Sequence, residues 1–177
     1  MNELVSTVIS VLGILTILGQ AILVFLLILL VIPKKKNSAV SRLYEFIRVN
    51  AFNFAFLVAS IATFGSLFLS EVAGFIPCKL CWWQRIFMYP SALILFISLL
   101  VNDRGVAKYI LPLSGIGALI AIYHYIMQLF PNILECSEET AKCSAVQFME
   151  FGYVTIPLMA FTAFLLIIVS LLFTVRK

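Results

Sequence analysis

Five long apolar runs alternate with short polar connections along the chain. A transmembrane helix needs about 20 consecutive apolar residues, and each run is close to that length or longer. The runs cover about Leu4–Ile32, Ala51–Leu69, Trp83–Val101, Tyr109–Phe130 and Val154–Val175. The first run is longer than a span requires, which indicates tilt or an end outside the hydrocarbon. The pattern therefore predicts an all-α, polytopic membrane protein with five spans.

The composition supports this prediction, because 63% of the 177 residues are hydrophobic and only 11% are charged. Soluble domains are typically about 25% charged. Too few polar side chains remain to cover a surface that faces water. We therefore expect one membrane-embedded bundle with no separate soluble domain.

The basic residues are concentrated in every second connection between the runs. Nine of them lie there or after the last run: Lys34, Lys35, Lys36, Arg42, Arg48, Arg104, Lys108, Arg176 and Lys177. The other connections hold only Lys79, Arg85 and Lys142. Cytoplasmic loops are enriched in Lys and Arg, so this asymmetry predicts an N-terminus outside the cytoplasm. Cytoplasmic loops beside anionic membrane lipid then explain the net charge of +4, and nucleic acid is not expected as a partner.

The first of these basic connections, residues 34–50, also carries a helical pattern. Val40, Leu43, Phe46 and Ile47 recur at the spacing of one helix face. Two interpretations stay open for this segment. It forms a short interfacial helix, or it is a charged anchor that only fixes the topology.

All four cysteines fall on the predicted outer side, where disulfides persist. Cys78 and Cys81 precede the third run, and Cys136 and Cys143 precede the fifth. Structural disulfides, a zinc site and a redox relay are the three interpretations. A disulfide across C-x-x-C closes a very small loop, so it removes little entropy from the unfolded chain, and this favours the relay. The wide second spacing and an oxidising compartment disfavour zinc, and we expect no metal.

The residues around the C-x-x-C pair strengthen the redox interpretation. Pro77 suits the first turn of a helix, whose positive end would favour thiolates at Cys78 and Cys81. Arg85 follows Cys78 by seven residues and Cys81 by four, so a helix puts all three on one face. We therefore expect the Arg85 cation to serve this site at the membrane edge, rather than to act only as a headgroup anchor.

Three stretches carry a resemblance to a known family. PCKLCWWQR, residues 77–85, resembles the C-x-x-C-x-x-[EQ]-R core of the DsbB/BdbC family of disulfide bond formation proteins. YHYIMQLFPNILEC, residues 123–136, looks like the family's third core helix running into its second cysteine pair. FGYVTIPLMAFTAF, residues 151–164, looks like the start of its last helix. The resemblance covers roughly Asn50 to Phe173.

The resemblance also implies how the chain is divided. Residues 51–177 would form the four-helix catalytic core of the family. Residues 34–50 would be the basic cytoplasmic connection that precedes it. Residues 1–33 depart from the family pattern as an extra N-terminal transmembrane helix, whose role the resemblance does not supply. Five spans still leave the core cysteines on the side that the family requires.

The resemblance implies a membrane oxidoreductase that reoxidises an extracytoplasmic thioredoxin-fold thiol oxidase of the DsbA/BdbD type. Electrons would pass from that partner to Cys136 and Cys143, then to Cys78 and Cys81, and finally to a membrane quinone, either ubiquinone or menaquinone. It further implies the bacterial cell (inner) membrane, with the cysteines on the periplasmic or extracytoplasmic side.

Four residues are candidates for contacts with the quinone. Arg85 would stabilise negative charge on thiolate and on the quinone oxygen. His124, the only histidine, would be a proton or hydrogen-bond partner, or else a satisfied interhelical side chain. Gln84 could hydrogen-bond in the same region. Trp82 fits stacking on a ligand and an aromatic belt at the membrane interface equally well.

Two other classes of protein remain open at this level. A vitamin K epoxide reductase-like enzyme also combines C-x-x-C with a quinone in a small bundle, but there the C-x-x-C follows the loop cysteines instead of preceding them. A non-enzymatic bundle with structural disulfides is the other class. A bound quinone, detected by its absorption, would separate that last class from both enzymes.

Overall fold

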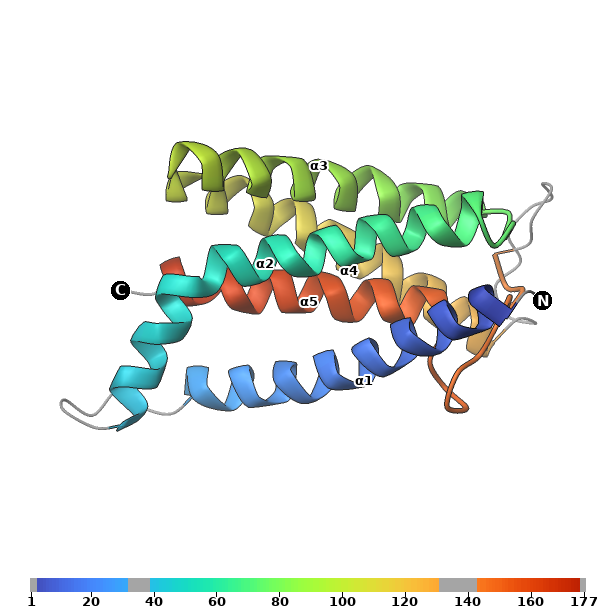
Figure 1. Ribbon diagram of the computed structural model, residues 1–177, viewed down its shortest axis with the longest axis horizontal. Helices are drawn as coiled ribbons and strands as arrows, with labels where there is room; N and C mark the ends of the chain where they lie inside the picture. The colour runs from blue at the N-terminus through green and yellow to red at the C-terminus, as the bar shows by residue number, and fades with distance from the viewer. Residues whose placement is uncertain (1–2, 32–38, 131–142, 176–177) are drawn as a thin grey trace.

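The computed structural model of the protein describes residues 3–31, 39–130 and 143–175 (Figure 1). Within these ranges the chain forms five α-helices and one short 3₁₀ turn, η1, at Arg104–Val106. The helices are α1 Glu3–Val31, α2 Ala39–Glu71, α3 Lys79–Val101, α4 Ala107–Leu129 and α5 Ile156–Val175. All five are long and apolar enough to cross a membrane. The predicted all-α architecture with five spans is therefore confirmed.

Helix α2 begins well before the apolar run that predicts it. The run starts near Ala51, whereas the helix starts at Ala39 and contains the amphipathic turns that carry Arg42 and Arg48. Figure 1 shows these first turns bent away from the rest of α2, on the side where α1 ends. The segment from Ala39 is therefore helical, as its spacing indicates, but it is the first part of α2 and not a separate interfacial helix.

Helix α5 holds the bundle together, because it packs against α1, α2 and α4 (Figure 1). Its Phe164 is fully buried and lies over Gly117 of α4, where a Cβ atom would overlap the phenyl ring. On another face, Gly19 of α1 lets that helix approach Leu166, since a Cβ there would be 3.0 Å from Leu166 Cδ1. Small residues at such crossings let membrane helices pack closely.

Helix α1 lies at the edge of the bundle and is fixed to it by polar contacts as well as by packing. Gln20 Oε1 accepts a hydrogen bond from Tyr153 Oη at 2.9 Å, and Gln20 Nε2 donates to Thr162 Oγ1 at 3.5 Å. Gly13 of α1 lies against Phe151, in the tight turn that precedes α5. The helix is therefore joined both to α5 and to the segment that follows Cys143.

Candidate functional site: a buried dithiol between two cavities

The C-x-x-C pair lies at the start of α3. Cys78 is the residue before the helix, and its carbonyl oxygen accepts a hydrogen bond from the backbone N–H of Trp82 at 3.1 Å. The first turn of the helix brings the two sulfurs to 3.3 Å, with the Cys78 thiol donating to Cys81 Sγ. The two side chains are therefore close enough to exchange a proton, or to form a disulfide after a small adjustment.

His124 of α4 connects this pair to the neighbouring segments. Its Nε2 atom lies 3.0 Å from the carbonyl oxygen of Cys143 and 3.6 Å from Cys78 Sγ. Its Nδ1 atom lies 3.0 Å from Gln84 Nε2. A carbonyl oxygen only accepts hydrogen bonds, so the proton of a neutral ring belongs on Nε2, and Nδ1 accepts from the Gln84 amide. His124 is 2% exposed and Gln84 is 5% exposed, so both belong to a buried polar network.

Cys143 lies in the same buried cluster as Cys78, together with Met127 of α4. One cysteine of the second pair is thus next to the first pair, although the two are far apart in the sequence. The contact of His124 with the Cys143 carbonyl holds the backbone of this segment against α4. The fourth cysteine of the sequence, Cys136, lies outside the described residues.

The environment of Cys78 differs from the one that the sequence predicts. The sequence-based expectation is that the helix N-terminus favours a thiolate at both cysteines. Instead, the hydrogen bond to Cys81, with burial as the second cause, raises the pKa of the Cys78 thiol from 9.0 to about 11. The expectation is wrong for Cys78, because its thiol donates a hydrogen bond and is 6% exposed. In the reduced pair, the Cys78 thiol therefore holds its proton more tightly than a free thiol does.

Arg85 is buried, at 9% exposed, which disfavours a role only as an exposed headgroup anchor, and its position at the membrane edge stays a prediction. Its Nε atom donates to Ser66 Oγ and its Nη2 atom donates to the Ser66 carbonyl, each at 2.9 Å. Both bonds connect α3 to α2. The guanidinium group also lies 5.2 Å from the ring of Trp82, a distance typical of a cation–π contact. These contacts fix the cation within about one helical turn of Cys81.

The two tryptophans project outward from this turn of α3. Trp82 is 54% exposed and Trp83 is 46% exposed, and neither lines either of the two cavities beside the dithiol. In a membrane-spanning bundle, such exposed rings contact lipid or the interface. Trp82 therefore covers Arg85 from the outside.

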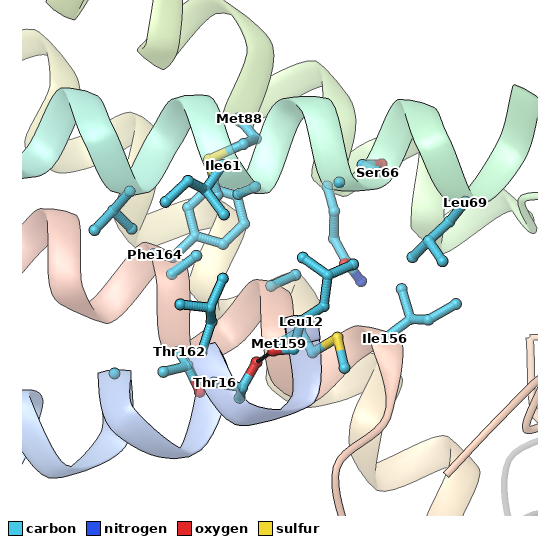
Figure 2. A pocket seen from close by; sticks show the side chains of 18 of the residues that line it. Leu12, Thr16, Ile61, Ser66, Leu69, Met88, Ile156, Met159, Thr162 and Phe164 are labelled. Carbon is cyan, nitrogen blue, oxygen red and sulfur yellow. Dashed lines mark hydrogen bonds between the residues drawn. The ribbon is translucent and has the colours of Figure 1, made fainter. Parts of the chain in front are cut away.

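Two cavities meet at the dithiol. The larger has a volume of about 320 Å³ and is lined mainly by apolar side chains of α1, α2, α3 and α5 (Figure 2). Close to the dithiol, Cys81, Gln84 and Arg85 contribute to its lining. The smaller, of about 10 Å³, is lined by Cys78, Cys81 and His124 among others. Of the described cysteines, Cys81 alone lines both cavities, whereas Cys78 lines only the small one.

The sequence does not predict a role at this site for two polar residues, Ser66 and Gln147. Ser66 of α2 holds Arg85, and Gln147 lines both cavities while its Nε2 atom donates to the Ile76 carbonyl at 2.8 Å. Each is a polar residue among apolar neighbours, which is the only signal that the sequence offers. Such isolated residues are common, so their roles depend on which helices pack together.

The same cluster has the geometry of a metal-binding group. One ligand atom from each of Cys78, Cys81 and His124 lies within 4.8 Å of the others. Two sulfurs and an imidazole nitrogen suit a thiophilic ion such as zinc. The sequence-based expectation of no metal remains a prediction.

The fold and the site together define a multi-pass membrane protein with a buried, redox-capable dithiol. Comparison with known proteins agrees with this class. The family model described as disulfide bond formation protein DsbB matches residues 48–174. The chain therefore belongs to the DsbB family, and the resemblance found in the sequence is confirmed.

Curated relatives carry corresponding names. Disulfide bond formation protein C of Bacillus subtilis is 46% identical over 117 residues, which cover 65% of this chain and 85% of the relative. A probable disulfide formation protein of Coxiella burnetii is 41% identical over 116 residues, covering 64% of this chain and 79% of the relative. No solved structure matches the chain. The relatives support an oxidoreductase role in disulfide bond formation at a membrane.

Proposed function

We propose that the protein reoxidises an extracytoplasmic thioredoxin-fold dithiol oxidase of the DsbA/BdbD type and transfers the electrons to a membrane quinone, ubiquinone or menaquinone. The observation that carries this proposal is the position of Cys81. Cys81 lines a small cavity together with Cys78 and His124, and also a large apolar cavity together with Arg85. This position suits a group that receives electrons from thiols and delivers them to a lipid-soluble acceptor.

The large cavity fits a quinone in size and in chemistry. Its volume of about 320 Å³ lies within the range of roughly 300–1,000 Å³ that is usual for ligand pockets. Most of its lining is apolar, as an isoprenoid chain requires, and Arg85 and Gln84 supply hydrogen-bond donors near Cys81. When bound, a quinone would accept two electrons and two protons. Arg85, Gln84 and Cys81 would contact its head group, while Trp82 would hold Arg85 in place.

The proposed thiol chemistry proceeds by exchange between disulfides. A thiolate of the reduced partner attacks the Cys136–Cys143 disulfide, forming a mixed disulfide and releasing one loop cysteine as a thiolate. The second partner thiolate displaces the other loop cysteine, so the partner leaves oxidised and the loop pair is left reduced. The loop pair then reduces the Cys78–Cys81 disulfide by the same two steps. The burial of Cys143 beside Cys78 supports a direct exchange between these two sulfurs.

His124 and Arg85 would assist this exchange from different sides of the pair. The Nε2–H group of His124 donates to the Cys143 carbonyl and also lies 3.6 Å from Cys78 Sγ, so the two acceptors would share it when that sulfur becomes a leaving group. Arg85 carries a permanent positive charge within about one turn of Cys81, where negative charge would develop. Gln84 keeps the His124 ring in one orientation through its contact with Nδ1.

The orientation and the division of the chain belong to the same proposal. The nine basic residues of the alternate connections and the C-terminal end support a cytoplasmic position for those segments. The dithiol end of the bundle would then face the outside of the cell membrane. Residues 51–177 would form the catalytic core, and residues 34–50 would be the basic cytoplasmic connection that precedes it. Residues 1–33 would be an addition to this core.

The test is a reconstituted reaction. Purified protein in lipid nanodiscs is mixed with a reduced thioredoxin-fold oxidase and a quinone, and quinone absorption and partner thiols are followed together. We expect one partner disulfide for each quinone reduced. Cys143→Ala should abolish oxidation of the partner, and Cys81→Ala should abolish quinone reduction with every thiol substrate. Normal quinone reduction by Cys81→Ala would overturn the proposal.

A further inference from the structure

Helix α1 lies outside the part of the chain that the family model matches. That match begins at residue 48, and the segment shared with the Bacillus subtilis relative covers 85% of the relative but only 65% of this chain. The relative therefore has little sequence left for a counterpart of α1. The helix nevertheless takes part in the large cavity beside Cys81.

One wall of that cavity consists of α1. The residues of this wall are Leu12, Leu15, Thr16, Leu18, Gly19 and Ile22. Figure 2 shows Leu12 and Thr16 of α1 across the cavity from Ile61 and Leu69 of α2, with Phe164 of α5 at another side. Without α1, the cavity would be open on this side, and the surfaces of α2 and α5 that line it would face lipid directly.

The wall formed by α1 has an opening toward α2. The two helices approach each other near the dithiol end, where a Cβ on Gly65 would lie 3.2 Å from Leu12 Cδ2. At the other end, Leu26 of α1 and Tyr44 of α2 belong to one buried cluster together with Phe173 of α5, which closes the cavity there. Between these two ends, Leu18 of α1 and Leu57 of α2 line the cavity and are still 54% and 55% exposed. We call this opening the α1–α2 window.

The cavity has a polar end and an apolar end. Cys81 and Arg85 lie at the polar end, and the lining along the window is mostly aliphatic or aromatic, since the hydroxyl of Thr16 donates to the Leu12 carbonyl of its own helix. A ligand with a polar ring and a long hydrocarbon chain matches this order. A polyprenyl chain is too long for a cavity of about 320 Å³, so its distal part must leave toward lipid, and the window provides the path.

We propose that α1 encloses the isoprenoid tail of the quinone and that the α1–α2 window is the lateral entrance through which the quinone reaches Cys81 from the bilayer. This inference rests on the proposed function and adds to it a tail site that includes a helix outside the family match. The contacts of Gln20 with Tyr153 and Thr162 keep α1 in place beside α5, so the window has a fixed position. The helix would thereby favour quinones with long tails over quinones without one.

The first test maps the tail directly. A quinone with a photoreactive diazirine in its second isoprene unit is bound to the whole protein in nanodiscs, and labelled peptides are identified by mass spectrometry. We expect label on α1 between residues 12 and 22 as well as on α2, removed by excess long-chain quinone and retained in excess phospholipid. Label confined to α2–α5 would overturn the proposal. Label removed equally by phospholipid would also overturn it, because the site would then be a general lipid site.

The second test narrows the window from either side. Leu18→Trp on α1 and Leu57→Trp on α2 place a large ring in it, and Ile14→Trp is the matched control. Ile14 is on α1, is 49% exposed and does not line the cavity. We measure affinities by competition against the photoreactive probe. The ratio of long-chain to tail-less quinone affinity should fall about tenfold in the two window variants and stay at the wild-type value in Ile14→Trp. An unchanged ratio in both window variants would contradict the proposal.

These tests separate the inference from the function on which it rests. Both measure binding and not turnover, so they remain informative if the protein reduces no quinone. Wild-type protein that turns over with quinone but leaves α1 unlabelled overturns the tail site alone. Wild-type protein that labels on α1 but never reduces quinone in the presence of a dithiol partner contradicts the proposed function and leaves the tail site standing.

Discussion

Cys78 and Cys81 have the same side chain but unequal positions. Cys78 donates a hydrogen bond to its neighbour and packs in a cluster with Cys143, whereas Cys81 borders the apolar cavity. Burial disfavours the charged form of a thiol, and a hydrogen bond donated by the thiol disfavours it further. The two sulfurs should therefore differ in reactivity when the pair is reduced.

The raised pKa of Cys78 predicts a pH profile. At pH 8, a thiol with a pKa of about 11 has roughly a hundredfold less thiolate than one with a pKa of 9.0. We expect alkylation of reduced Cys78 by iodoacetamide to keep accelerating as the pH rises toward 11, instead of levelling off near 9. Cys81→Ala removes the main cause of the raised pKa, so it should shift the profile to lower pH. Peptide mass spectrometry gives the rate for Cys78 alone, and a plateau near pH 9 in the unaltered pair would contradict the assignment.

Arg85 should matter for its charge more than for its bonds to α2. A hydrogen bond to a charged group is worth roughly 1.5–3 kcal/mol, and about 1.4 kcal/mol corresponds to a factor of ten in rate. We expect Arg85→Gln to slow quinone reduction by about one to two orders of magnitude, and Arg85→Lys to recover part of the loss. Stopped-flow absorption of the quinone measures this rate.

Ser66→Ala is the matched control for this prediction, because it removes the acceptor of Arg85 Nε and leaves the cation. It should lower the thermal unfolding temperature slightly and change the rate much less than Arg85→Gln does. A Ser66→Ala variant as slow as Arg85→Gln would show that the connection between α2 and α3, and not the charge, determines the rate.

At the level of helices, the crossing of α4 and α5 depends on one small residue. A Cβ at Gly117 would overlap the buried ring of Phe164, and overpacking of this kind costs typically about 1–3 kcal/mol. Gly117→Ala should therefore lower the thermal unfolding temperature measured in detergent. Gly115→Ala, two residues away, is the control, since its Cβ would meet no atom within 4 Å. Equal stability of the two variants would contradict the packing described for Gly117.

The helices themselves follow from the sequence more readily than their bounds or contacts. Run length alone predicts five spans, because the hydrocarbon thickness requires it. The start of α2 at Ala39 lies outside the predicted span, since its first turns are too polar to count as an apolar run, although their helical spacing is visible. The bonds of Arg85 to Ser66 cannot be predicted, because they depend on how α2 packs against α3. The register of Arg85 with the C-x-x-C pair is visible, because it is internal to one helix.

For the molecule as a whole, the orientation in the membrane is the central expectation. Cys78 and Cys143 are buried, so a bulky membrane-impermeant maleimide reaches them less readily than small iodoacetamide does, and introduced cysteines are needed. In a cysteine-free background, Ala145→Cys near the dithiol and Lys108→Cys at the other end provide exposed thiols. A membrane-impermeant maleimide should label Ala145→Cys in intact cells, and Lys108→Cys only after permeabilisation. The reverse pattern would invert the topology predicted from the basic residues.

The position of Cys81 between the two cavities also has a consequence for unintended electron transfer from soluble thiols to the quinone. If electrons reach the acceptor only through this sulfur, small thiols that enter beside Cys143 meet the disulfide chemistry before they meet the quinone. In the proposed function, a thiol in the surrounding solution would then reduce the quinone only by exchange at these disulfides, and not by direct contact. The rate at which soluble thiols outside the membrane drain the quinone pool would then depend on their access to the cysteine sulfurs.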